Sequence, residues 1–175
     1  GGNYNVVVGD EAGTALTTGD NNVAIGYAAL DAEDTGGNSV AIGYNALTAQ
    51  NNDAANYNTA VGASAGAAIT TGVQNTIVGA LAGDALTDAD FNVAVGINAL
   101  TSDTLGSQST AVGDNTLAAQ NFTTATDTHN VAVGISAGKS ITTGIRNTLI
   151  GALAGDALTD ADDNVVVGGN ALTSD

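Results

Sequence analysis

A short repeated unit fills the whole chain. The unit reads Asn-β-Ala-β-Gly, where β is a β-branched residue, and it recurs ten times with small variations along 175 residues. Its last residue is invariant, and we call these residues the anchor glycines: Gly9, Gly26, Gly43, Gly62, Gly79, Gly96, Gly113, Gly134, Gly151 and Gly168. Most intervals between them are 17 residues, with one of 19 and one of 21. A fixed period of this kind indicates stacked coils, so we expect one repeat domain over residues 1–175.

Each unit has the pattern of a short strand. The residues one and three before every anchor glycine are Val, Ile or Thr, and residues two apart share one face of a strand. The residue between them is Ala in six copies and a larger aliphatic in the rest. No 3.6-residue period of a helix is present. The sequence therefore predicts an all-β fold, a parallel β-roll or β-solenoid of ten coils of about 17 residues.

The two faces of these strands lead to a prediction about burial. We expect the β-branched positions, which include Val95, Val133 and Ile150, to form a dry ladder inside each coil. The opposite face is also apolar, so we expect identical chains to cover it. Ala94 would then allow close approach between chains. Ile77 and Leu149 would form matching bulky layers in that inter-chain core.

Polar residues precede the strands at a fixed place. Four residues before the anchor glycine stands Asn in eight copies, and Ser39 or Ser109 in the other two. Stacking of the coils aligns these amides, which can hydrogen-bond along the axis as polar ladders do in stacked sheets. The expected ladder includes Asn22, Asn58, Asn75, Asn92, Asn130, Asn147 and Asn164.

The coils are of two kinds, which we call Leu coils and Gly coils. Four residues after the anchor glycine, a Leu coil has Leu and a Gly coil has Gly, with a Leu or Ile three residues further on. No coil has both aliphatic residues. The kinds alternate in pairs, so four coils make a super-repeat, and residues 58–103 recur as residues 130–175 with 35 of 46 identical. The pattern begins and stops in mid-super-repeat, so we expect a segment of a longer fibre.

Composition and charge exclude several functions. The 18 Asp and Glu residues outnumber Lys139 and Arg146 and give a net charge of −16, which disfavours nucleic acid and anionic membranes as partners. His129 has only Asp127 near it as an orienting carboxylate, and six aromatic residues are too few for a sugar-hydrolysing cleft. We therefore expect no enzymatic activity, and interpret Lys139 and Arg146 as relieving local acidity.

Acidic turns raise the question of a metal. Asp84, Asp88 and Asp90 form one acidic segment, and Asp156, Asp160 and Asp162 repeat it. Oxygen-rich turns can hold Ca²⁺, but the calcium-binding nonapeptide Gly-Gly-x-Gly-x-Asp is absent. We favour a solvated acidic edge, keep these six residues as calcium candidates, and expect no other cofactor.

Two strings resemble a known family of repeats. Asn22-Val23-Ala24-Ile25-Gly26 and Asn38-Ser39-Val40-Ala41-Ile42-Gly43 resemble the head repeat of YadA-like trimeric autotransporter adhesins. The strings Ile69-Thr70-Thr71-Gly72 and Ile141-Thr142-Thr143-Gly144 are similar to repeats of phage tail-fibre proteins. The resemblance implies a left-handed parallel β-roll that assembles as a homotrimer on a cell or virion surface. The 17-residue coil is longer than that of the adhesin head, so the turns are not carried over.

The resulting hypothesis is a structural fibre segment, extracellular or virion-borne, that acts as a spacer or adhesive shaft. Its partners would be copies of itself, and host-surface glycans or proteins. A self-polymerising extracellular filament, stacked head to tail, is the main alternative. Ice binding through Thr17, Thr70 and Thr142 is a remote one, because every Leu coil interrupts the array. We interpret Tyr27 and Tyr44, which match in adjacent coils, as packing at a subunit edge rather than as a sugar-contacting patch.

Overall fold

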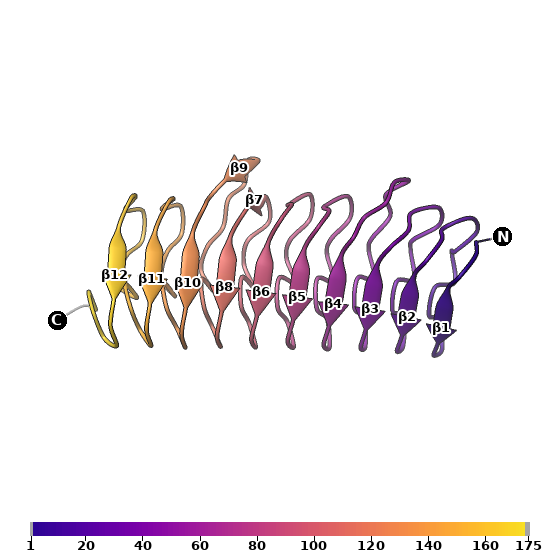
Figure 1. Ribbon diagram of the computed structural model, residues 1–175, viewed down its shortest axis with the longest axis horizontal. Coiled ribbons are helices and arrows are strands. Elements are labelled where there is room, and N and C mark those ends of the chain that lie inside the picture. The colour runs from indigo at the N-terminus through magenta and orange to yellow at the C-terminus, as the bar shows by residue number, and fades with distance from the viewer. Residues whose placement is uncertain (1, 174–175) are drawn as a thin grey trace.

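Ten three-residue strands run side by side along the molecule in one parallel sheet (Figure 1). The computed structural model describes residues 2–173 and contains no helix among them. The sheet consists of β1 (Val6–Val8), β2 (Val23–Ile25), β3 (Val40–Ile42), β4 (Thr59–Val61), β5 (Thr76–Val78), β6 (Val93–Val95), β8 (Thr110–Val112), β10 (Val131–Val133), β11 (Thr148–Ile150) and β12 (Val165–Val167). Two further strands, β7 (Gly106–Ser107) and β9 (Thr126–Asp127), pair with each other. β9 stands above the row of turns in Figure 1.

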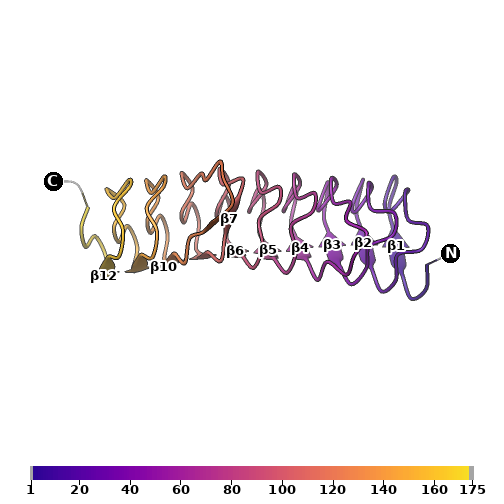
Figure 2. The same ribbon diagram turned by 90° about the horizontal axis from the view of Figure 1, so that it is seen from above.

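The register of the sheet follows the repeat. Val6 pairs with Val23 and Val8 with Ile25, so each strand lies beside the equivalent strand of the next coil. The same register holds across the longer connections, where Val40 pairs with Thr59 and Thr110 with Val131. Seen from above, the strands form one side of a rod and the turns form the rest (Figure 2). The expected all-β, parallel β-solenoid of ten coils is confirmed.

The anchor glycines are required by the closeness of successive coils. Gly26 has a φ of +132°, and a Cβ added to it would lie 2.4 Å from the carbonyl oxygen of Gly43. No L-amino acid with a side chain could occupy that place without moving the backbone. The repeat therefore fixes a glycine at the same point of every coil.

The difference between Leu and Gly coils also has a steric cause. In both kinds, the residue four after the anchor glycine is left-handed, with φ of 53° at Leu30 and 51° at Gly13. A Cβ on Gly13 would lie 2.8 Å from Cδ1 of Leu16, and one on Gly83 would lie 2.8 Å from Cδ1 of Leu86. Both aliphatic residues compete for the same core volume. One coil can hold only one of them.

The strands bury the face that we expected to lie outside. From β2 to β11 of the long sheet the central residues, among them Ala94, Ile77 and Leu149, are completely buried within their own chain. Ile77 reaches over Gly83, since a Cβ added there would lie 3.1 Å from Cδ1 of Ile77. The prediction that Ala94, Ile77 and Leu149 pack between chains is therefore wrong. The interior of so thin a coil has room for Ala, and for a larger residue only where glycine leaves space.

The β-branched positions point outward, which corrects the predicted dry ladder. Val133 and Ile150 are 38% and 42% exposed, and Val95 is half-buried. Period-two alternation identifies the residues that share a face, but it does not say which face points inward. Both faces here are apolar, so hydropathy could not decide between them.

The asparagine column lies inside the coils, beside the central residues. In most coils, the side-chain amide of the asparagine donates to the backbone carbonyl 14 residues later, as Asn75 does to Ala89 at 2.8 Å. The side-chain oxygen accepts from the backbone of the next coil, as Asn58 does from the Asn75 amide at 2.9 Å. Such bonds join Asn58, Asn75 and Asn92, and also Asn130, Asn147 and Asn164. Asn22 bonds in the same way to Asn5. Each amide thus closes its own coil and ties it to a neighbour.

Candidate functional site

The outward face of the long sheet is a continuous apolar surface, which we call the outer face. It consists of the residues one and three before each anchor glycine, and all twenty are Val, Ile or Thr. None of these residues is charged. Along the middle of the sheet the outward residues are half-buried, as in β2, β3, β4, β6 and β8, or more exposed, as at Val133 and Ile150, so the described chain leaves the outer face only partly covered. An exposed apolar patch of this length is unusual and marks an interaction site.

Aromatic residues gather along both borders of the outer face. One border is the column five residues before the anchor glycine, and the other is the column directly after it. Five of the six aromatic residues of the chain stand in these two columns: Tyr4, Tyr57 and Phe91 in the first, Tyr27 and Tyr44 in the second. All five are between 43% and 86% exposed. His129 also belongs to the first column, and its backbone is left-handed.

Tyr27 and Tyr44 form a stacked pair in that border. Their ring centroids lie 5.5 Å apart, with planes inclined by 14°. A hydrogen bond with the Glu11 carboxylate is the main reason that the pKa of Tyr27 is raised above its ordinary value. The two rings stack on each other in the column that borders the outer face, which suits the expected packing at a subunit edge.

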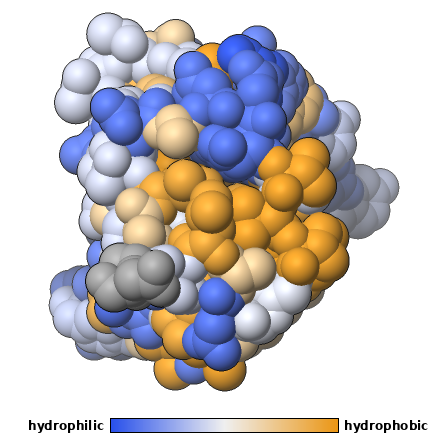
Figure 3. All heavy atoms as spheres, turned by 90° about the vertical axis from the view of Figure 1, so that its left-hand side faces the viewer, coloured by the Kyte–Doolittle hydropathy of each residue, from blue (hydrophilic) through white to orange (hydrophobic). Residues whose placement is uncertain are grey.

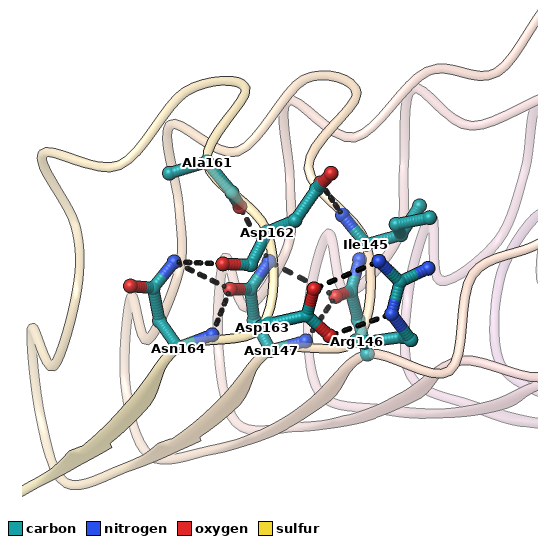
Figure 4. Close-up of polar contacts among 8 residues, drawn as sticks. Ile145, Arg146, Asn147, Ala161, Asp162, Asp163 and Asn164 are labelled. Atoms are coloured by element: carbon teal, nitrogen blue, oxygen red, sulfur yellow. Dashed lines mark hydrogen bonds and ion pairs between the residues drawn. The ribbon is translucent and has the colours of Figure 1, made fainter.

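An ion pair occupies the C-terminal part of the other border (Figure 4). Arg146 Nε and Nη2 donate to the two carboxylate oxygens of Asp163 at 2.6 and 2.8 Å. The guanidinium holds the pKa of Asp163 below its ordinary value. Next to this pair, Asp162 Oδ1 accepts from the Ile145 amide at 2.8 Å, and Asn147 bonds to Asn164. Arg146 therefore neutralises a charge in the same column, as the sequence suggested.

Removal of Arg146 is expected to have almost no effect on the fold. Both side chains are about half exposed, and exposed pairs contribute little to stability. The Arg146→Gln variant should melt within error of the parent at pH 7. The lowered pKa of Asp163 means that any contribution exists above the pKa of its unfolded form and is lost as the pH falls through the folded value. A pH-dependent difference in melting above pH 5 would contradict this.

The acidic residues lie mostly away from the outer face. Of the 18 Asp and Glu residues, only Asp10, Asp114 and Asp163 stand in the outer face or its borders. The candidate calcium ligands act as acceptors between neighbouring coils: Asp84 from Thr101 at 2.7 Å, Asp88 from Thr71 at 2.6 Å, Asp90 from the Val73 amide at 2.8 Å, and Asp162 from the Ile145 amide.

The six calcium candidates do not come together into a cluster. Asp160 accepts from its neighbour Thr159, and Asp156 is the equivalent of Asp84 one super-repeat later. Among residues 2–173, no three His, Cys, Asp or Glu side chains are arranged to hold a metal. The geometry thus gives Asp84, Asp88, Asp90 and Asp162 roles between neighbouring coils, and the described residues offer no calcium cage.

The threonines considered for ice binding are engaged in the turns. The hydroxyls of Thr17, Thr70 and Thr142 donate to carbonyls of the next coil at 3.1, 3.3 and 3.1 Å. They form three separate sites rather than an unbroken array. The remote alternative gains no support from this geometry.

A polar cluster inside the coils was missed at the sequence level. Seven residues after the anchor glycine, Gly coils have Leu or Ile, but Leu coils have Glu33, Gln50, Asp103 and Gln120. All four are fully buried, and the acids bond to the glutamines, Glu33 to Gln50 at 3.0 Å and Asp103 to Gln120 at 2.5 Å. The signal was present, because this position is polar in each of these Leu coils.

The two ends of the rod expose the interior of a coil. Figure 3 looks at the C-terminal end and shows apolar side chains gathered in the middle of the end face, with hydrophilic residues around them. Leu172 is 56% exposed there, and at the other end the central residue Val7 is 43% exposed. In the described part of the chain, no pocket opens between the coils. The exposed apolar surface therefore lies on the outer face and at the ends.

Comparisons with known proteins give no relative for this chain. No family model, no curated protein and no solved structure matches it. A separate observation is that residues 2–173 include no helix long and apolar enough to cross a membrane. What the chain does must therefore be argued from the outer face, its borders and the surrounding charge.

Proposed function

We propose that the chain is a non-enzymatic structural fibre segment that assembles with copies of itself through the outer face. The observation that carries the proposal is a ten-strand sheet whose outward residues are all β-branched and uncharged. The fibre would act as a spacer or adhesive shaft outside the cell, on a cell surface or on a virion. The resemblance of its strings to adhesin heads and tail-fibre repeats supports that setting.

The size of the outer face suits a stable interface. Ten strands at ~4.8 Å give a length of about 48 Å, and the face with its borders is about 15–20 Å wide. The resulting area of about 700–950 Å² is close to the ~800 Å² that each partner contributes to a standard interface. Aromatic residues at its borders are typical of interfaces as well.

Charge favours a copy of the same chain as the occupant. With a net charge of −16, two copies repel each other along most of their surface. Fifteen of the 18 acids lie outside the outer face and its borders, so this is the surface on which copies can meet. A copy also has the same spacing between coils, so every Val and Ile meets an equivalent residue along the whole rod.

A closed ring of three chains is the assembly we propose. Cyclic assembly hides the outer face of every copy and leaves no unpaired face for further growth. Three chains around one axis follow the trimeric architecture of the adhesin heads that the strings resemble. The aromatic border columns of neighbouring chains would then face each other at the seams.

Native mass measured by light scattering tests the assembly. We expect about three times the chain mass of 16.9 kDa for the parent. Val95→Asp, which places a charge on the outer face of β6, should give single chains. Thr18→Asp adds the same charge in an exposed turn and should keep the trimer.

A monomeric parent would exclude self-assembly through the outer face. A dimer would keep the interface and reject the ring of three. A continuous series of masses would favour the alternative, a filament that grows head to tail through the apolar ends. Loss of the trimer in both Asp variants would mean that general charge, rather than the outer face, controls association.

A further inference from the structure

Two coils lack the asparagine that closes the others. In seven coils the side-chain amide of this asparagine donates to the backbone carbonyl 14 residues later, and we call these coils closed. The accepting carbonyls belong to Gly19, Gly36, Gly72, Ala89, Gly106, Gly144 and Ala161. In the coils of β3 and β8 the equivalent residues are Ser39 and Ser109. Fourteen residues after them stand Asp53 and Thr123, which are exposed in the two long connections. These coils are open where the others are closed.

A glutamine takes over the place of the missing asparagine. Gln50 Nε2 donates to Ser39 Oγ at 3.0 Å and to Glu33, and its oxygen accepts from Asn58 at 2.8 Å. Gln120 repeats all three bonds, to Ser109 Oγ at 2.9 Å, to Asp103, and from Asn130 at 2.9 Å. We call each set of acid, serine and glutamine a polar plug.

The acid of each polar plug holds the base of the long connection. Glu33 accepts from the Gly36 amide at 2.7 Å and from the Asn56 side chain at 2.9 Å. Asp103 accepts from the Gly106 amide at 3.1 Å and from the Phe122 amide at 2.9 Å. The donors differ in kind and in place: Asn56 follows the exposed residues of its loop, whereas Phe122 precedes those of the other, so each acid holds one side of its connection. A buried carboxylate with several N–H donors is satisfied without a cation.

The axial ladder is interrupted at the same two places. The backbone amides of Ser39 and Ser109 donate to Asn22 Oδ1 and Asn92 Oδ1 of the coil before, so the ladder reaches both serines. A serine has no side-chain carbonyl that could accept from the next coil, so the ladder ends there. New series of asparagine hydrogen bonds begin at Asn58 and at Asn130. The ladder therefore stops at each open coil, where the glutamine joins the two series.

We propose that the polar plug is a loop-insertion device, which lets a coil open into a protruding loop while the buried acid, serine and glutamine keep hydrogen-bond partners. It acts independently of any assembly of the chain. The loops themselves share only their first residues and differ in length by two, whereas the super-repeat around them is largely identical. Each loop contains a run of exposed residues, residues 53–55 in one and residues 123–125 in the other. The device thus makes these connections the positions at which a rigid rod can present variable surface.

A thermodynamic cycle on the second open coil tests the proposal. Deletion of Thr123, Thr124, Thr126 and Asp127 reduces the interval from 21 residues to 17 and leaves Ala125 as the residue 14 after position 109. Ser109→Asn then restores the asparagine of a closed coil. We expect this substitution to lower the melting temperature with the full loop, where the added amide meets no carbonyl and crowds Gln120. With the shortened loop, Ser109→Asn should instead raise the melting temperature. We expect the fall with the full loop and the rise with the shortened loop to be about 3 °C or more each.

Asn75→Ser serves as the control, because it opens a coil that has no loop, and should lower the melting temperature. The first open coil gives an independent repeat, with deletion of Ala54 and Ala55 and Ser39→Asn. An effect of Ser109→Asn with the same sign in both loop lengths overturns the proposal. So does failure of the shortened Asn chains to fold at both coils, since a shortened coil with Asn should close like its neighbours.

Discussion

Replacement of Ala94 by aspartate is expected to unfold the middle of the rod. Ala94 is fully buried between Ile77 and Ala111 of the adjacent coils. A carboxylate there would have no donor and no solvent. An unpaired buried charge costs about 3–5 kcal/mol, which corresponds to a fall in melting temperature of about 10 °C or more in a chain of this size. Circular dichroism melting of the purified variant measures it.

Val95→Asp is the matched control, because it places the same charge one residue away on the outer face. It should prevent assembly and leave the fold of each chain intact. Ala94→Asp leaves the outer face unchanged, so any association would raise its melting temperature and could only reduce the expected difference from Val95→Asp. If Val95→Asp melted lower than Ala94→Asp, the inward and outward faces described above would be reversed.

The second large effect is expected from Gln50. Gln50→Leu removes the donor to Glu33 at 3.0 Å and leaves the Asn58 amide without its acceptor in the polar plug. The side chain keeps a similar volume, so the loss is of hydrogen bonds rather than of packing. We expect a cost of about 3–5 kcal/mol, because a buried carboxylate loses a partner. Urea denaturation followed by circular dichroism gives the free energy of unfolding.

Gln74→Leu makes the same exchange at a border position that is exposed in the single chain, and in the single-chain Val95→Asp background it should change the free energy of unfolding by less than about 0.5 kcal/mol. The double variant Glu33→Leu, Gln50→Leu should lose less than the sum of the two single variants, because the bond between them is counted twice. Strict additivity would show that the acid and the glutamine act separately.

Most of the fold could be predicted from the repeat in the sequence. Anchor glycines at a constant interval, with β-branched residues around one small residue, are sufficient to predict parallel strands stacked in register. Each coil has a large aliphatic residue either four residues after the anchor glycine, as at Leu30, or seven after it, as at Leu16, and never at both. This pattern also indicated that each coil has core volume for one such side chain. The asparagine column was predicted from its position alone, although its bonds to the carbonyl 14 residues later were not.

The candidate site was harder to predict, since its direction depends on the cross-section of a coil. Val95 is a better strand residue than Ala94, yet the interior is narrow and admits the smaller side chain. Glu33 and Gln50 were overlooked because polar residues near turns are usually solvated. Only their constant distance from the anchor glycine distinguishes them from surface residues, and that distance gains its meaning once the coils are stacked.

The direction of the backbone hydrogen bonds has a mechanical consequence. Bonds such as Val23 N to Ser39 O join one coil to the next and therefore run along the rod. A load applied between the two ends pulls them apart one coil at a time, instead of shearing a whole sheet at once. Each released coil of 17 residues would extend to about 56–61 Å, whereas it occupies ~4.8 Å of the stack. Such a rod would lengthen under tension in many small steps, and the two coils with protruding loops would give the longest ones.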